Sequence, residues 1–303
     1  MKKTVLITGV AGFIGSTFAK ELDSSKYLIF GIDDLSSGNK KSIPKNVIFF
    51  KQKISKKIPK KLEDKQVKID FIFHFAGQSS GEISFEDPID DLKKNTITTI
   101  NLIQFSIRKK IKKFFYMSSM SVYGDAKKAS ERHDMNPKTC YGVSKLSSEY
   151  YLKVFSNELN FIILRLFNVY GPPQKLDNNK QGMIRIYLTQ LKKNNQIVVK
   201  GSTKRYRDFI FIDDVTKILK KLMRIKTKNI ILNIGTGKKT TIENIISEIK
   251  KLHHGAKFKI EGNTKGDQLG IYADIGYLKK LIPNLKFKSL KKGLKDFYKS
   301  NFL

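Results

Sequence analysis

The sequence is poor in the residues that mark several classes of protein. A single cysteine, Cys140, among 303 residues excludes an intrachain disulfide framework and is typical of a reducing compartment. The four histidines and one cysteine offer no metal-ligand spacing, so we expect no metal site. No run of 18 apolar residues occurs, and nothing in the sequence predicts a membrane span. We therefore expect a cytoplasmic protein with no membrane partner.

Acidic residues and arginine are also scarce. The chain has 59 Lys and Arg against 27 Asp and Glu, which gives a formal net charge of +32. Such a charge is found in nucleic-acid-binding proteins, but only seven of the basic residues are arginine. Dedicated phosphate and base readers favour the planar, bidentate guanidinium group. We interpret the lysines as a solvated surface and expect no nucleic-acid partner.

Apolar runs alternate with segments of helical periodicity over about the first 170 residues. This alternation predicts an α/β fold, a Rossmann-type doubly wound parallel sheet. The expected strands cover residues 5–8, 27–32, 47–50, 70–75, 114–118 and 161–167, and the expected helices cover 13–22, 92–110 and 141–159.

After residue 170 the alternation is less regular, which indicates a smaller α/β C-terminal domain. Short strands are expected at 197–200, 207–212 and 230–234, and helices at 183–191, 215–224 and 242–252. We expect a first domain at 1–170, completed by parts of 206–236, and a substrate-binding domain at 171–303.

A glycine-rich loop joins the first strand to the first helix. Gly9, Gly12 and Gly15 give the spacing G-x-x-G-x-x-G. These positions allow a tight turn, a close approach of the backbone to a pyrophosphate, and close packing of helix and strand. Asp33 lies 18 residues past Gly15, at the end of the second strand. A carboxylate there accepts hydrogen bonds from a ribose 2′-OH and favours NAD over NADP, unless Asp33 only caps the next turn.

Two further segments contain candidate catalytic residues. Tyr141 and Lys145 are four residues apart at the start of a long helix, which puts both on one face. The ammonium is expected to lower the pKa of the phenol, so that Tyr141 can act as a base. Ser119 and Ser121 follow a buried strand, where ligands bind in parallel sheets. Taken alone, the Tyr-Lys spacing also fits an ordinary amphipathic helix.

The combination resembles the extended short-chain dehydrogenase/reductase family, and within it the NAD-dependent nucleotide-sugar epimerase/dehydratase group. The resemblance covers nearly the whole chain, with seven motifs in the family's order. The matching segments include the glycine loop 8–15, then 32–38, 73–78, 84–95, 167–172, 207–215 and 233–237.

The resemblance implies an NAD-binding first domain and a nucleotide-sugar substrate. NAD is then expected to contact the glycine loop and a set of residues around it, namely Phe13, Ile14, Asp33, Phe75, Ala76, Gly77, Asn95, Tyr141 and Lys145. The substrate is expected to contact Ser119, Asn168, Arg207 and Lys265. At Lys265 the epimerases usually have arginine; lysine can substitute as a point charge without bidentate geometry. A UDP-sugar is expected, with the nucleotide left open by this departure.

The residues after Ser119 indicate which of the family's reactions to expect. Where 4,6-dehydratases of the family carry Asp-Glu, this chain has Met120 and Ser121, which cannot serve as an acid/base pair. The segment is most similar to UDP-hexose 4-epimerases, which implies a 4-epimerase with a role in carbohydrate metabolism and cell-surface polysaccharide biosynthesis. The alternatives are a nucleotide-4-keto-sugar reductase of the same family and a non-catalytic dinucleotide-binding regulator. The family's two long helices, here 92–110 and 141–159, also imply a homodimer through a four-helix bundle.

Overall fold

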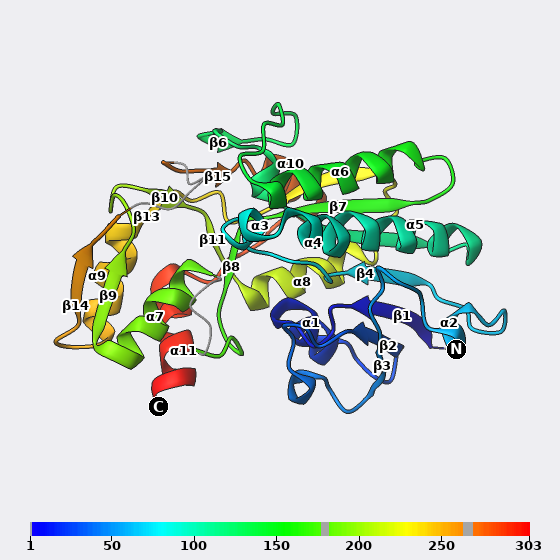
Figure 1. Ribbon diagram of the computed structural model, residues 1–303, viewed down its shortest axis with the longest axis horizontal. Helices are drawn as coiled ribbons and strands as arrows, with labels where there is room; N and C mark the ends of the chain where they lie inside the picture. The colour runs from blue at the N-terminus through cyan, green and yellow to red at the C-terminus, as the bar shows by residue number, and fades with distance from the viewer. Residues whose placement is uncertain (1, 177–181, 263–268) are drawn as a thin grey trace.

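The computed structural model describes residues 2–176, 182–262 and 269–303, and is built around a parallel sheet of seven strands (Figure 1). The strand order is β12-β7-β5-β4-β1-β2-β3. The strands are β1 (Lys3–Thr8), β2 (Tyr27–Asp33), β3 (Val47–Lys51), β4 (Phe71–His74), β5 (Lys113–Ser119), β7 (Phe161–Leu166) and β12 (Ile230–Ile234). This order and the parallel pairing confirm the predicted Rossmann-type doubly wound fold.

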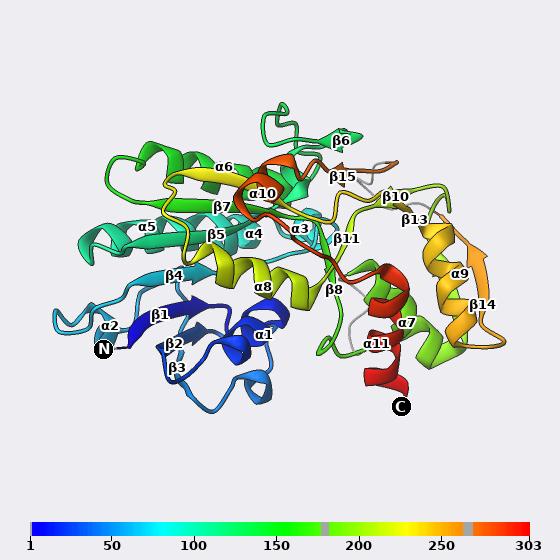
Figure 2. The ribbon, with the colours of Figure 1, turned by 180° about the vertical axis from the view of Figure 1, so that it is seen from behind.

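Helices cover both faces of the sheet because its strands are apolar on both sides. The face toward the viewer in Figure 1 carries α4 (Pro88–Leu92), α5 (Thr98–Arg108) and α6 (Cys140–Val154). The opposite face, toward the viewer in Figure 2, carries α8 (Ile212–Leu222) and α10 (Gly276–Leu281), and α1 (Phe13–Glu21) packs against α8. Within the described ranges, no helix is long and apolar enough to cross a membrane.

The C-terminal part has its own hydrophobic cluster. There α7 (Met183–Asn194), α9 (Ile242–Leu252) and α11 (Leu290–Phe302) pack together, beside the parallel pair β9 (Gln196–Val199) and β14 (Lys257–Ile260). The remaining elements are short: α2 (Lys60–Glu63), α3 (Ile83–Glu86), β6 (Lys128–Ala129), β8 (Asn168–Tyr170), β10 (Tyr206–Arg207), β11 (Phe209–Phe211), β13 (Thr240–Thr241) and β15 (Tyr272–Ala273), with single 3₁₀ turns at Lys40–Ser42 and Met120–Val122. Since β12 belongs to the main sheet, the sheet includes chain from beyond residue 170; the division into two domains stays a prediction.

The structure departs from the expected single helix 92–110 in the first half of that segment. It begins earlier, at Pro88, where Asp87 caps it by accepting a hydrogen bond from Asp90 N at 2.8 Å. A π-helical turn, Lys93–Ile97, then separates α4 from α5. Such turns shift the faces of a helix and often lie at functional sites. Here the turn contains the buried Asn95, one of the predicted cofactor residues.

The expected strand 207–212 is divided into β10 and β11 by the buried Asp208. Its carboxylate accepts hydrogen bonds from the backbone N–H groups of Thr236 at 2.8 Å, Gly237 at 2.8 Å and Ala273 at 3.2 Å. A buried carboxylate needs such donors. The sequence pattern gave no sign of this break.

Candidate active site

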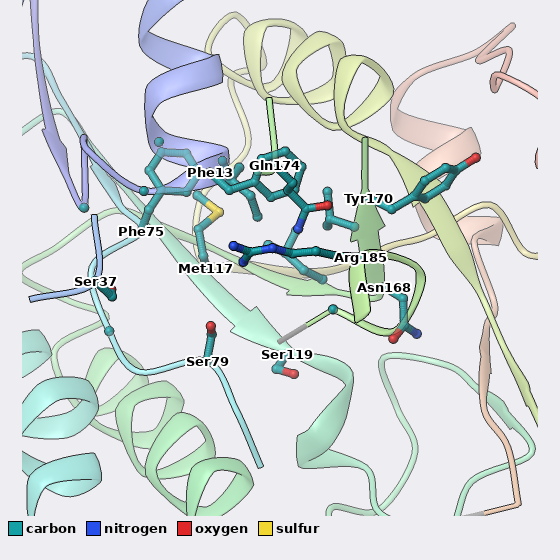
Figure 3. A pocket seen from close by; sticks show the side chains of 18 of the residues that line it. Phe13, Ser37, Phe75, Ser79, Met117, Ser119, Asn168, Tyr170, Gln174 and Arg185 are labelled. Atoms are coloured by element: carbon teal, nitrogen blue, oxygen red, sulfur yellow. The ribbon is translucent and has the colours of Figure 1, made fainter. Parts of the chain in front are cut away.

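A cavity of about 940 Å³ opens at the carboxyl ends of the central strands. Its walls come from the glycine loop, from the ends of β4, β5 and β7, and from the first turn of α7 in the C-terminal part. Figure 3 shows the labelled side chains around a common space, with Phe13 and Phe75 beside one another and Ser119 and Asn168 on the other side. This volume is near the upper end of the roughly 300–1,000 Å³ that is usual for ligand pockets.

The glycine loop between β1 and α1 leaves no room for side chains at two of its glycines. A Cβ atom on Gly9, whose φ is +70°, would lie 2.6 Å from Ala76 N, and one on Gly15 would lie 2.2 Å from Gly9 O. The N-cap of α1, Gly12, has no side chain to cap the helix, so its first N–H groups face the cavity. This is the arrangement that binds a pyrophosphate at a helix N-terminus, and the loop therefore fits NAD.

Asp33 lies under the glycine loop. Its two carboxylate oxygens accept hydrogen bonds from Ala11 N at 2.9 Å and Leu35 N at 2.8 Å. Burial raises the pKa of this carboxyl, and these two N–H groups oppose the rise. The hydrogen bond from Leu35 N shows that Asp33 caps the next turn, which is the alternative considered from the sequence. Asp33 is not among the described residues that line the cavity. Each oxygen retains a lone pair, and binding of the ribose by Asp33 stays a prediction.

The other predicted cofactor residues fall into two groups. Phe13, Ile14, Phe75 and Gly77 line the cavity. Ala76 and Asn95 lie behind this wall: Ala76 N donates a hydrogen bond to Thr8 Oγ1 at 3.3 Å, and Asn95 is buried.

Ser119 ends β5, Ser121 lies in the 3₁₀ turn that follows, and both line the cavity. Ser119 Oγ donates to Ser121 Oγ at 3.1 Å and accepts from Ser121 N at 3.1 Å. The next helix approaches this turn closely, since a Cβ on Gly142 would lie 2.6 Å from Ser121 O. Thr139 caps that helix by accepting from Gly142 N at 3.0 Å. The sequence thus places Tyr141, the first-turn residue of α6, beside Ser119.

Tyr141 is buried in the cavity wall, close to Ser119. Burial raises the pKa of its phenol to about 12, and the nearby Ser119 hydroxyl only partly opposes this rise. The expectation from the sequence, that the pKa of the Tyr141 phenol is lowered, is therefore wrong for the protein chain alone. The reason is geometric: Lys145 Nζ lies 5.9 Å from the Tyr141 ring centroid and donates instead to Met117 O at 3.0 Å.

Lys145 is buried among groups from several elements. Burial lowers the pKa of its ammonium to about 8, while the charges of Asp91 and Glu149 raise it. The structure thus brings Ser119, Ser121, Tyr141 and Lys145 together in one wall of the cavity, as the sequence predicted.

The predicted substrate residues are spread more widely. Asn168 lines the cavity and donates to Met120 Sδ at 3.5 Å. Arg207 is buried outside the described lining, where its Nη1 donates to Tyr206 O at 2.8 Å. Burial lowers the pKa of Arg207 to about 10, and the neighbouring Arg205 lowers it further. Lys265 lies outside the described residues.

Sequence reasoning missed a cation in the cavity. Arg185, in the first turn of α7, lines it with Gln174 and Lys175, and its Nε donates to Lys175 O at 2.6 Å. Figure 3 shows Arg185 extending toward the middle of the labelled side chains, whereas the Tyr170 ring points away from them. No Asp or Glu is found among the described lining residues, so the cavity favours anionic ligands. The only signal in the sequence that pointed to Arg185 was the rarity of arginine, of which the chain has seven.

Comparisons with known proteins agree with this geometry. A putative UDP-glucose 4-epimerase of Methanocaldococcus jannaschii is 34% identical over 281 residues, which cover 89% of this chain and 90% of that protein. The solved UDP-glucose 4-epimerase of Thermotoga maritima is 30% identical, with a TM-score of 0.89 over 98% of both chains. The UDP-N-acetylglucosamine 4-epimerase of Methanobrevibacter ruminantium is 27% identical, with a TM-score of 0.91 over 99% of this chain and 98% of that one.

The sequence profile of the NAD-dependent epimerase/dehydratase family matches residues 5–235, which include the glycine loop, the Ser119 turn and the Tyr141 helix. The family resemblance stated from the motifs is confirmed, and with it NAD as the cofactor. The chain belongs to the NAD-dependent epimerase/dehydratase family.

Proposed function

We propose that the protein is an NAD-dependent nucleotide-sugar 4-epimerase of the UDP-hexose type. The observation that carries this proposal is the grouping of Ser119, Tyr141 and Lys145 beside a phosphate-binding glycine loop, followed by Met120 and Ser121 in place of an acid/base pair. The similar Thermotoga enzyme, solved with UDP-glucose, supports the substrate class.

Tyr141 is placed to act as the base. When bound, NAD would take the hydride from C4 of the sugar and return it to the opposite face of the 4-keto sugar, and its oxidised form would bring a positive charge near the phenol. Tyr141 takes the proton of the sugar 4′-OH, and Ser119, which lies close to that phenol, holds the hydroxyl in line. The resulting 4-keto sugar rotates in the cavity and presents its opposite face. Tyr141 then returns its proton as the hydroxyl forms again with the opposite configuration.

Two arginines, the buried Arg207 and the partly buried Arg205, suit the phosphates of the substrate. Burial lowers the pKa of both groups, and the charge of Arg205 lowers that of Arg207 further. An anion between them relieves this repulsion. We propose that these two arginines and Asn168 bind the diphosphate of the substrate. Arg185, which lines the cavity, would contact the same end of the ligand.

Dehydration does not suit this site. Eliminating water across two carbons needs an acid and a base beside the sugar. Met120 Sδ accepts a hydrogen bond from Asn168, and Ser121 is bonded to Ser119. Neither side chain is ionisable near neutral pH, which favours an epimerase within the epimerase/dehydratase family.

The test is direct interconversion of nucleotide sugars. Purified protein is mixed in turn with UDP-glucose, UDP-galactose, UDP-N-acetylglucosamine and UDP-glucuronate, and the products are separated by chromatography. We expect the 4-epimer of at least one of them, with no net consumption of NAD. A product formed only with stoichiometric loss of reduced cofactor would indicate a reductase, and bound NAD without any product would contradict the proposal.

We further propose a homodimer through α4, α5 and α6. Exposed apolar side chains gather on these helices, with Ile89 59% exposed on α4 and Val154 74% exposed on α6, near the half-exposed Tyr150. Apolar patches of this kind mark interaction surfaces. The cytoplasmic location and the part in polysaccharide synthesis stay predictions.

The variant Val154→Asp tests this surface. A carboxylate at the centre of an apolar interface has no partner, so we expect the light-scattering mass to fall from twice to once 34.8 kDa. Ile260→Asp on the exposed strand β14, far from α6 in the fold, is the matched control and should stay dimeric. A wild-type monomer at all concentrations would rule the dimer out.

A further inference from the structure

A buried carboxylate behind the cavity wall has no part in the function proposed so far. Asp91, in the last turn of α4, is 1% exposed. Its Oδ1 accepts hydrogen bonds from Asn95 Nδ2 at 3.0 Å and Gln78 Nε2 at 3.1 Å. Its Oδ2 is buried and makes no hydrogen bond to any described residue. Burial raises the pKa of this carboxyl, while the nearby Ser144 hydroxyl and the charge of Lys145 oppose the rise. A buried charge needs a cation nearby.

The cation that faces Asp91 is Lys145. Asn95, which is hydrogen-bonded to Asp91, presents its buried Oδ1 toward Gly77, and that oxygen has no described partner. Asn95 Oδ1 and Lys145 Nζ lie 2.4 Å and 3.5 Å from the position of a Cβ on Gly77, so the two atoms border the same small space. Asp91, Asn95 and Lys145 therefore lie close together between α4 and α6.

Other ionisable groups also surround Lys145. Tyr116 of β5 lies with its ring centroid 5.0 Å from Nζ, and Tyr141 of α6 at 5.9 Å. From β4, His74 is held neutral by burial and by the Lys145 charge, and both its ring nitrogens hydrogen-bond threonine hydroxyls. The only other carboxylate acting on Lys145 within the described chain is Glu149 of α6.

Glu149 already has a counter-ion. Arg165 donates to it through Nε at 3.0 Å and through Nη2 at 2.7 Å, and both side chains are almost fully buried. Ser118 Oγ donates to the same carboxylate. A bidentate guanidinium pair of this kind neutralises the carboxylate locally. Asp91, in contrast, is hydrogen-bonded by neutral amides, so its charge remains to balance Lys145.

We propose that Asp91 is a positioning residue of the reaction site, the buried counter-ion that keeps Lys145 protonated beside Tyr141. The inference rests on the proposed function, because a charged Lys145 serves the reaction by stabilising the phenolate of Tyr141 and by binding the nicotinamide ribose. Asp91 touches neither ligand and acts through Lys145. Its carboxylate offsets the burial that otherwise strips the proton from this ammonium.

The variant Asp91→Asn removes the charge and keeps the acceptor oxygen for Asn95 and Gln78. Loss of an opposite charge at short range lowers the pKa of an ammonium by about 1–3 units. The pKa of Lys145, about 8 in the fold, lies below its usual 10.5, so the unfolded chain binds more protons between these values. The free energy of unfolding should then rise with pH in this window, and in Asp91→Asn the rise should begin about 1–3 pH units lower. The alkaline limb of kcat should move by the same amount.

Two further proteins make the result decisive. Asp90→Asn removes the same charge from the neighbouring residue of α4, where the carboxylate pairs with Lys94 at 2.6 Å on the surface, and should leave both curves in place. In a Lys145→Met background, Asp91→Asn should no longer shift any rise of the unfolding free energy at alkaline pH. Identical curves for Asp91→Asn and Asp90→Asn would overturn the proposal. The unfolding curves decide it even if no sugar is epimerised, an outcome that would reject the proposed function instead.

Discussion

Replacing Tyr141 by phenylalanine is expected to lower kcat for epimerisation by about 10²–10⁴-fold, the usual contribution of a positioned general base. Within the described cavity wall, the phenol lies close to Ser119 and beside the Lys145 cation. Phenylalanine keeps the buried ring, so NAD and UDP-sugar binding should persist. Steady-state kinetics and equilibrium dialysis measure these effects.

The pH dependence identifies the base. Burial raises the pKa of Tyr141 to about 12, so the reactive phenolate is a minor form that grows tenfold per pH unit at neutral pH. Lys145 loses its proton near pH 8. The wild-type rate should therefore rise with pH up to about 8 and then level or fall, whereas the residual rate of Tyr141→Phe should lack the rise. Tyr150→Phe, which removes a half-exposed hydroxyl from the same helix, is the control. Full activity in Tyr141→Phe would assign the base elsewhere.

The variant Glu149→Gln is expected to destabilise the fold by about 3–5 kcal/mol, because it leaves the Arg165 charge buried without a counter-ion. Burial alone would lower the pKa of Arg165, but the hydrogen bonds and charge of Glu149 raise it above its usual value. Arg165 also donates to Tyr123 OH at 3.0 Å, and Tyr123 OH donates to Asn233 Oδ1 at 2.6 Å. The ion pair thus holds β7, the Ser119 turn and β12 together.

Urea unfolding followed by circular dichroism measures this effect. The matched control is Glu63→Gln, which breaks the Arg108–Glu63 pair, whose side chains are 55% and 39% exposed. Exposed pairs contribute about 0–1 kcal/mol, so the control should unfold close to the wild type. Equal midpoints for the two variants would show that the buried pair does not stabilise the fold.

Local pattern was enough to predict the first half of the molecule. The strand, glycine loop and helix at 3–21 are specified within one short segment, and the carboxylate of Asp33 follows at the end of β2. The Ser119 turn and the Tyr141 helix were also predictable, because residues at the carboxyl ends of neighbouring parallel strands meet at one edge of the sheet. The order of the sheet then brought these segments together.

The rest depends on contacts that no local pattern encodes. Arg185 lines the cavity only because α7 packs across it from the C-terminal part. The pKa of Tyr141 depends on burial by several elements, which outweighs the nearby ammonium. Asp91 faces inward because α4 begins at Pro88 and a π-helical turn follows, whereas the periodicity alone indicated one continuous helix.

The position of β12 at one edge of the sheet affects how the chain can assemble. β12 hydrogen-bonds to β7 along its whole length, from Ile230 to Ile234, yet it is synthesised after β8, α7, β9 and α8. A nascent chain that has emerged only as far as residue 170 presents β7 as an open strand edge, a template for pairing with other chains. The C-terminal part must therefore begin to form before the N-terminal sheet is closed. During synthesis the two parts of the chain are therefore expected to fold as one unit. A fragment that ends near residue 170 is expected to expose the edge of β7 and to aggregate through it.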